Sequence, residues 1–197
     1  MRTSSLFSRR NGRSEPDLDI VRYDAVDAHV RLSAVLRAEM GPAVTADRIN
    51  VIAIGSDRTT GDCLGPLVGE FLSGVGSFVV YGTLDEPIHA ANMADVVRGI
   101  DGFTVAIDAA LGSPVGGISV RRGPLAPGAA FGRELPRVGN VAISALVCEA
   151  GPLGFERLRS VRLGFVRDVA HAIAVSLAGA IGAPLASGAG APYPTLA

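Results

Sequence analysis

A strand, a polar turn and the start of a helix follow one another at residues 51–66 (VIAIGSDRTTGDCLGP). The apolar run at 51–54 is long enough for a buried strand, Gly55 ends it, and an apolar, helix-like stretch begins after Asp62. This order places the polar turn, residues 56–62, at the carboxyl end of a strand. In open α/β sheets, ligands and catalytic groups gather at that end.

The same pattern continues along the chain. Further strands are predicted at 77–81 and 103–107, and helices at 64–72 and 88–100. Short apolar strands that alternate with helices form parallel βαβ units in a sheet that is covered on both faces. The sequence therefore predicts an α/β fold of three layers, with a mostly parallel sheet between two layers of helices.

Outside this repeat, the apolar spacing predicts a helix over 19–40 and a strand over 116–121 at an edge of the sheet. Another strand is expected over 141–147. A long helical pattern covers 155–181 and is expected to break near Gly164.

Three segments are predicted to lack regular structure. Residues 123–137 contain three prolines and three glycines and are expected to form a loop. Residues 1–18 are rich in Ser and Arg, and residues 182–197 in Gly, Ala and Pro, so both ends are predicted to be disordered tails. A single α/β domain over 19–181 remains.

The charge and composition exclude several classes of function. The formal net charge of −1 gives no electrostatic reason to expect nucleic acid or an anionic membrane as a partner. All 18 basic residues are Arg, which excludes a Schiff-base lysine and a P-loop lysine. Trp is absent and aromatic residues make up 5% of the chain, so a platform for stacking bases is not expected.

The cysteines and the apolar segments indicate a cytoplasmic protein. Cys63 and Cys148 lie far apart without a CxxC spacing, so two reduced, buried thiols are expected. No apolar run reaches the roughly 20 residues that a bilayer span needs. The first residues carry Arg but no apolar core of a secretory signal.

Asp62 and Asp108 are the strongest candidates for chemistry. Each follows a buried strand, so both are expected at the same edge of the sheet. Two close carboxylates split their pKa values and can act as acid and base on a water molecule. Given a third ligand they could hold a divalent metal, although we do not favour one. Alternatively, Asp62 caps the helix that begins at Leu64, and Asp108 binds loop amides.

The polar loop before Asp62 is a candidate binding segment. Asp57, Arg58, Thr59 and Thr60 precede a helix start, where backbone N–H groups can bind an anion or a peptide carbonyl. Arg58 either pairs with a neighbouring carboxylate or contacts the substrate. The chain contains neither a Walker motif nor a GxSxG nucleophile motif, so nucleophilic catalysis is not favoured.

A second polar loop, residues 83–89 (TLDEPIH), follows the strand at 77–81 and is expected at the same sheet edge. His89 could complete a metal set with the two aspartates, carry a proton, or make ordinary hydrogen bonds at a helix start. Glu86 is the alternative third group.

Four segments in order resemble the YyaC family of sporulation proteins. They are residues 55–69 (GSDRTTGDCLGPLVG), 81–90 (YGTLDEPIHA), 106–112 (AIDAALG) and 123–128 (GPLAPG). The resemblance covers roughly residues 50–180. That family is similar to the germination protease of spores and, more distantly, to hydrogenase-maturation endopeptidases, which implies a phosphorylase/hydrolase-like α/β fold.

The resemblance also implies roles for residues. In the germination protease, two aspartates in DALGP-type and IDAL-type motifs are essential, and they match Asp62 in DCLGP and Asp108 in IDAAL. The maturation enzymes bind nickel through equivalent acidic positions and a later His. Residues 139–144 (GNVAIS) contain no His, so no metal site of that kind is expected unless His89 substitutes from another loop.

Two hypotheses follow. The first is a spore protease-like peptidase, associated with sporulation, in which Asp62 and Asp108 activate water against a peptide bond. In this hypothesis Asp57, Arg58, Thr59, Thr60, Glu86 and His89 bind the substrate, and no cofactor is needed. The alternative is a non-catalytic sporulation protein that binds a peptide or protein in the same cleft. Both are compatible with an oligomer.

Overall fold

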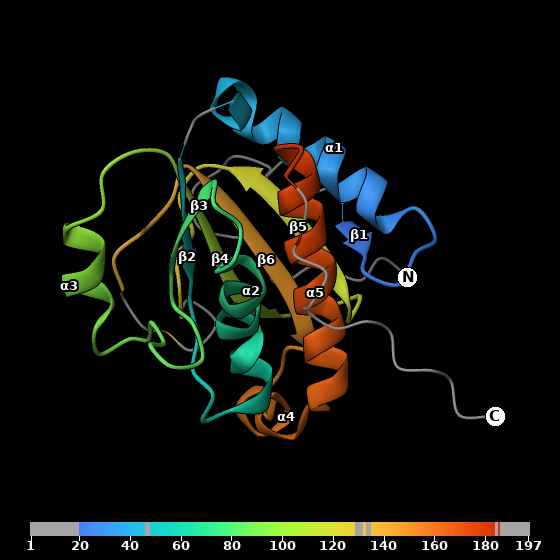
Figure 1. The fold of residues 1–197 in the computed structure, drawn as a ribbon. Coiled ribbons are helices and arrows are strands. Elements are labelled where there is room, and N and C mark those ends of the chain that lie inside the picture. Colours follow the sequence, from blue (N-terminus) through green and yellow to red (C-terminus); the bar gives the residue numbers. More distant parts are fainter. Residues whose placement is uncertain (1–19, 46–47, 129–131, 133–134, 184, 186–197) are drawn as a thin grey trace, which may run out of the picture.

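A six-stranded sheet with the strand order β1-β5-β6-β4-β2-β3 runs through the computed structural model (Figure 1). The structure describes residues 20–45, 48–128, 132, 135–183 and 185. The strands are β1 (Ile20–Arg22), β2 (Ile49–Ala53), β3 (Phe78–Tyr81), β4 (Thr104–Leu111), β5 (Gly117–Arg122) and β6 (Val141–Cys148). The helices are α1 (Ala28–Met40), α2 (Leu64–Leu72), α3 (Met93–Arg98), α4 (Gly154–Ser160) and α5 (Leu163–Ala180), with 3-10 turns η1 (Gly41–Thr45) and η2 (Thr60–Cys63).

The sheet is mixed, with a parallel centre. β3, β2, β4 and β6 run parallel to one another, while β5 is antiparallel to both β6 and β1. The predicted α/β class with a mostly parallel sheet is therefore confirmed. The parallel strands follow from the helices α2 and α3, which return the chain to the starting end of the sheet between β2, β3 and β4.

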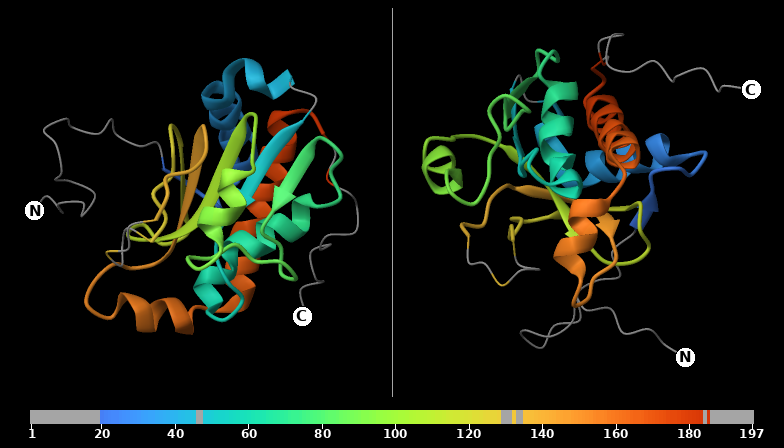
Figure 2. Two further views of the ribbon diagram at one scale, coloured as in Figure 1. Left: turned by 90° about the vertical axis from the view of Figure 1, so that its left-hand side faces the viewer. Right: turned by 90° about the horizontal axis from the view of Figure 1, so that it is seen from below.

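The two faces of the sheet are covered unequally. α1, α2 and α5 pack on one face, and the six-residue helix α3 packs on the other together with segments near Ile88, Leu125 and Val138 (Figure 2). Side chains alternate between the faces along each strand. The row beneath α1, α2 and α5 contains Val51, Val105 and Val141, and the row on the opposite face contains Ile52, Ala106 and Ala142.

Helix α5 forms the centre of the helical layer. It packs against both α1 and α2, and its buried residues include Val166, Ile173 and Leu177. By length and composition α5 could cross a membrane, but 56% of it is buried inside the molecule. That burial is typical of a core helix.

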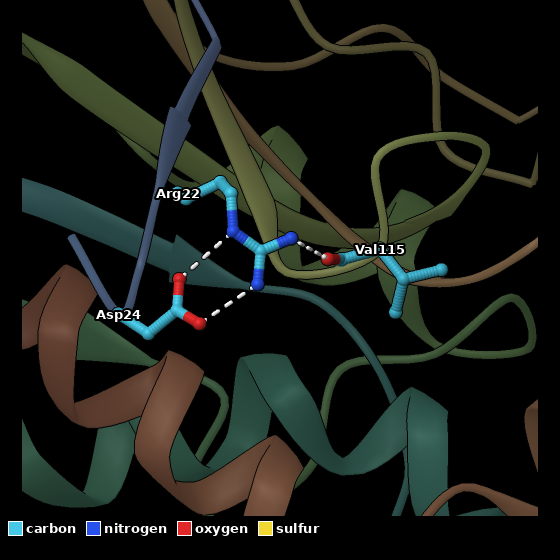
Figure 3. Close-up of polar contacts among 3 residues, drawn as sticks. All are labelled: Arg22, Asp24 and Val115. Carbon is cyan, nitrogen blue, oxygen red and sulfur yellow. Dashed lines mark hydrogen bonds and ion pairs between the residues drawn. The ribbon is translucent and has the colours of Figure 1, made fainter.

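The helix predicted over 19–40 is wrong at its start. Ile20–Arg22 forms β1, which pairs with β5, and α1 begins only at Ala28. Figure 3 shows Arg22 donating from Nε and Nη2 to the Asp24 carboxylate, at 2.9 and 2.7 Å, and from Nη1 to the Val115 carbonyl at 3.0 Å. These contacts join β1 to a segment more than 90 residues away, which helical periodicity cannot reveal.

The strand predicted over 103–107 is too short. β4 runs through Asp108 to Leu111, so Asp108 lies within the strand and not in an exit turn. β6 pairs with β4 over this whole extension and keeps it in the sheet. The strand predicted at an edge over 116–121 is β5, which lies inside the sheet because β1 covers it.

Two helix boundaries also differ from the prediction. The helix predicted over 88–100 begins at Met93, because Ile88 pairs with Ile54 and Asn92 forms a turn with His89. The long helix over 155–181 breaks at residues 161–162, before Gly164, where the backbone is extended. Most residues of the predicted disordered tails, and part of the loop 123–137, lie outside the described residues.

Candidate active site

The turn that carries Asp62 folds back onto the end of β2. Gly55 has φ of +147°, and a Cβ there would collide with the carbonyl oxygen of Asp62. The Ser56 N–H donates to that same oxygen at 3.2 Å. Gly55 is therefore needed both for its backbone conformation and for the close approach of the turn.

Three glycines, at positions 61, 65 and 69, allow the turn η2 and helix α2 to pack closely against neighbouring segments. A Cβ at Gly61 would collide with Leu158 of α4, one at Gly65 with the carbonyl of Ile54, and one at Gly69 with the carbonyl of Gly82. Residues four apart share one face of a helix. The spacing in TTGDCLGPLVG thus holds α2 close to the strand ends.

Asp108 lies in β4, one of the central strands of the sheet. Its neighbour Ile107 belongs to the core beneath α5, so alternation points the Asp108 side chain to the opposite face, beyond Ala106. The backbone N–H groups of Ala109 and Gly128 donate hydrogen bonds to its carboxylate. The loop at 123–128 therefore lies against this aspartate.

The two predicted aspartates interact. Burial raises the pKa of Asp108 well above its ordinary value, and the charge of Asp62 raises that pKa further. The N–H groups of Ala109 and Gly128 act in the opposite direction, because they favour the charged carboxylate. Burial and the charge of Asp62 therefore both disfavour ionisation of Asp108, as in acid–base pairs of carboxylates.

Asp62 lies in η2 and not at the cap of α2. The N-cap position of α2 is Cys63, and it makes no side-chain cap hydrogen bond. Burial raises the pKa of the Cys63 thiol, and the charges of Asp57 and Asp62 raise it further. Because the thiolate is the nucleophile, Cys63 is a poor candidate for covalent catalysis at neutral pH.

The predicted binding loop, residues 57–60, leads into the turn η2. Asp57 and Arg58 are exposed, while Thr59 and Thr60 are partly buried. The Ser56 hydroxyl accepts the Arg58 N–H at 3.2 Å, which orders the turn. Arg58 forms no ion pair with a carboxylate of any other described residue.

The loop after β3 lies at the same edge of the sheet. The Gly55 N–H donates to the Ile88 carbonyl at 2.8 Å, which joins this loop to the end of β2. Glu86 is exposed, and its N–H donates to the Thr83 hydroxyl at 3.2 Å. His89 is partly buried and its Nδ1 accepts the Ala91 N–H at 3.3 Å, so in the neutral ring the proton is on Nε2.

The metal set considered for His89 does not form. Within the described part of the chain, no three His, Cys, Asp or Glu side chains gather in a way that could hold a metal ion. His89 therefore shares the sheet edge with Asp62 and Asp108 without joining them in a ligand cluster.

Sequence reasoning missed two groups that flank Asp108. Ser144 of β6 lies directly opposite Asp108 in the register and is partly buried. The Gly128 N–H comes from the loop at 123–128. Alternation in VAISALV shows that Ser144 shares a face with Ala142, but only strand register places that face beside Asp108.

Comparisons with known proteins agree with the motifs. The chain is 39% identical over 156 residues to "Uncharacterized protein YyaC" of Bacillus subtilis (strain 168), covering 75% of this chain and 74% of that protein. It also matches the crystal structure of a [NiFe] hydrogenase maturation protease, HycI, from Thermococcus kodakarensis KOD1, with a TM-score of 0.39 and 19% identity over 73% of this chain and 98% of the other. Residues 20–176 match the family described as "Protein of unknown function (DUF1256)", and the chain belongs to this family together with YyaC.

Proposed function

We propose that the protein is a peptidase-type hydrolase in which Asp62 and Asp108 act as a carboxylate pair. The observation that carries the proposal is that parallel pairing of β2 with β4 brings Asp62 and Asp108 to the same end of the sheet, where the charge of Asp62 acts on the Asp108 carboxylate. Such a pair supplies a general acid and a general base at the same pH. Resemblance of the DCLGP and IDAAL motifs to those of the germination protease supports the same pair.

We assign the role of the acid to Asp108, whose ionisation is disfavoured by burial and by the charge of Asp62, and the role of the base to Asp62. Asp62, ionised, removes a proton from a water molecule, and the water oxygen bonds to the peptide carbonyl carbon. Asp108, protonated, gives its proton to the carbonyl oxygen. As the tetrahedral species collapses, the C–N bond breaks, the amine takes the proton held by Asp62, and Asp108 recovers its own proton from a hydroxyl. The products are one carboxyl group and one amine, with both aspartates restored.

The surrounding loops supply the substrate contacts. Arg58 is exposed beside η2, and its guanidinium can stabilise the developing oxyanion together with backbone N–H groups of the turn. Asp57, Thr59, Thr60, Glu86 and His89 would bind the peptide on either side. No cofactor is required by this chemistry.

The test uses Asp62→Asn, Asp108→Asn and the wild-type protein against a pool of unmodified peptides, with products identified by mass spectrometry. We expect each substitution to reduce cleavage by about 10²- to 10⁴-fold, because each removes a proton-transfer group. Glu70→Gln, on the exposed side of α2, is the matched control and is expected to retain cleavage. Full activity in both Asn variants would overturn the mechanism.

One observation favours a second function, binding without catalysis. The hydrogen bond from the Gly128 N–H favours the charged form of the Asp108 carboxylate, whereas the proposed acid needs the protonated form. In that case no cleavage product appears from any peptide, and the Asn variants still bind the peptides that the wild type binds.

We also propose a cytoplasmic protein that acts during sporulation. The support is the resemblance to YyaC-type sequences and the family membership. A reporter fused to the protein's own promoter, followed through sporulation of the host, tests the timing, and constant expression in growing and sporulating cells argues against it.

A further inference from the structure

The corner formed by α4 and the start of α5, residues 153–163, carries exposed apolar side chains. Five large hydrophobic residues are exposed among the described residues, and three of them lie within eleven positions of the chain. They are Leu153, Phe155 and Leu163, with 61%, 50% and 57% of their surfaces exposed. Figure 1 shows α4 beside the end of α5 at which that helix begins. Water-exposed side chains of this size at one corner are typical of an interaction surface.

The buried side of α4 contacts the candidate active site. Gly154 and Leu158 are buried, and Leu158 lies against Gly61 in the turn η2 that carries Asp62. α4 also contacts β6, whose Ser144 lies opposite Asp108. The buried side of α4 therefore lies against the turn that carries Asp62, and the outer side of α4 is one helix away from that turn.

The corner is positively charged. Residues 153–163 contain three arginines and one acidic residue, Glu156. Arg157 pairs with Glu149 at 3.5 Å, but Arg159 and Arg162 are exposed and have no ion-pair partner in the described part of the chain. Two guanidinium groups without carboxylates beside apolar side chains match a ligand that brings its own carboxylates.

We propose that Leu153, Phe155 and Leu163, with Arg159 and Arg162, form the docking surface for the peptide substrate. The segment it recognises carries apolar side chains flanked by Asp or Glu. This inference rests on the proposed function and adds the substrate class. Apolar contact supplies the area buried on binding, and the arginines select acidic over basic segments.

Binding is measured in the Asp62→Asn background, where cleavage does not interfere. The probes are two short fluorescent peptides that alternate Leu and Phe with Glu in one case and with Lys in the other. We expect the Glu peptide to bind and the Lys peptide to bind at least about tenfold more weakly. Arg159→Glu combined with Arg162→Glu should reverse that preference, an outcome that misfolding cannot produce.

The apolar contribution has its own matched control. Leu153→Ser combined with Leu163→Ser should weaken binding of the Glu peptide by about tenfold. Val26→Ser combined with Val30→Ser changes exposed apolar residues before and within α1 and should leave binding unchanged. Equal losses in both double variants would overturn the proposal.

Two other outcomes also overturn it. One is binding of phosphatidylglycerol vesicles that depends on the same residues while neither peptide binds. The other is a dimer that the Leu153 and Leu163 substitutions dissociate, since the corner would then be covered by a second copy. A different result would contradict the proposed peptidase function and leave the docking surface standing. In that result the Glu peptide binds as described, but the wild-type protein releases no product from any peptide.

Discussion

The negative charge of Asp62, in the turn after β2, acts on the carboxylate of Asp108, within β4, and raises its pKa. Burial of Asp108 contributes the larger part of that effect. The two residues are 46 positions apart in the chain, and the parallel pairing of β2 with β4 brings them to the same end of the sheet. This interaction leads to several measurable consequences.

Removing the charge of Asp62 should lower the pKa of Asp108. In Asp62→Asn the electrostatic penalty on ionising Asp108 disappears, while the burial remains. Carboxyl chemical shifts followed by NMR across a pH titration measure this change directly. Glu70→Gln, on the exposed side of α2, should leave the Asp108 titration unaltered.

Asp108→Asn should change how stability depends on pH. A raised pKa means that the native state binds the proton more tightly than the unfolded chain does. The resulting stabilisation is complete below the unfolded pKa and is lost as the pH rises through the native pKa. Since Asn does not titrate, the variant should gain stability relative to the wild type as the pH rises from acidic to neutral. Urea unfolding at several pH values tests this, and a constant difference would contradict it.

Gly65→Ala should destabilise the protein strongly. The added Cβ would collide with the carbonyl of Ile54, a backbone atom that cannot move without disturbing β2. We expect a loss of about 3 kcal/mol or more in the free energy of unfolding. Gly74→Ala is the control, because a Cβ there meets nothing within 4 Å. Comparable losses in both variants would show that the close packing of α2 is not the cause.

Neither cysteine should react rapidly in the native protein. Burial raises the pKa of the thiols of Cys63 and Cys148, and a protonated, buried thiol is a poor nucleophile. Labelling with iodoacetamide at neutral pH should be slow for both until denaturant is added. Rapid modification of native Cys63, with loss of cleavage, would instead support covalent catalysis.

Local patterns in the sequence were sufficient for much of the fold. The alternation of apolar runs and helical segments between residues 51 and 107 depends on neighbours in the chain, so it predicted β2, α2, β3, the first part of β4 and their parallel order. The positions of Asp62 and Asp108 after apolar runs depend on the same local information. For this reason both aspartates were identified as candidates that meet at one sheet edge.

Long-range pairing decided what the local patterns could not. β1 is a strand because β5 provides its hydrogen bonds, and β4 continues through Asp108 because β6 lies beside it. The same pairing places Ser144 opposite Asp108, and the fold of the loop at 123–128 brings the Gly128 N–H to its carboxylate. The environment that raises the pKa of Asp108 is made by residues distant in the chain.

The sequence by itself determined the strand–turn–helix units and the two acids, because these follow from short-range apolar periodicity and backbone preferences. Only the tertiary structure decided register, burial and the contacts of those acids, because these depend on which distant segments pack together.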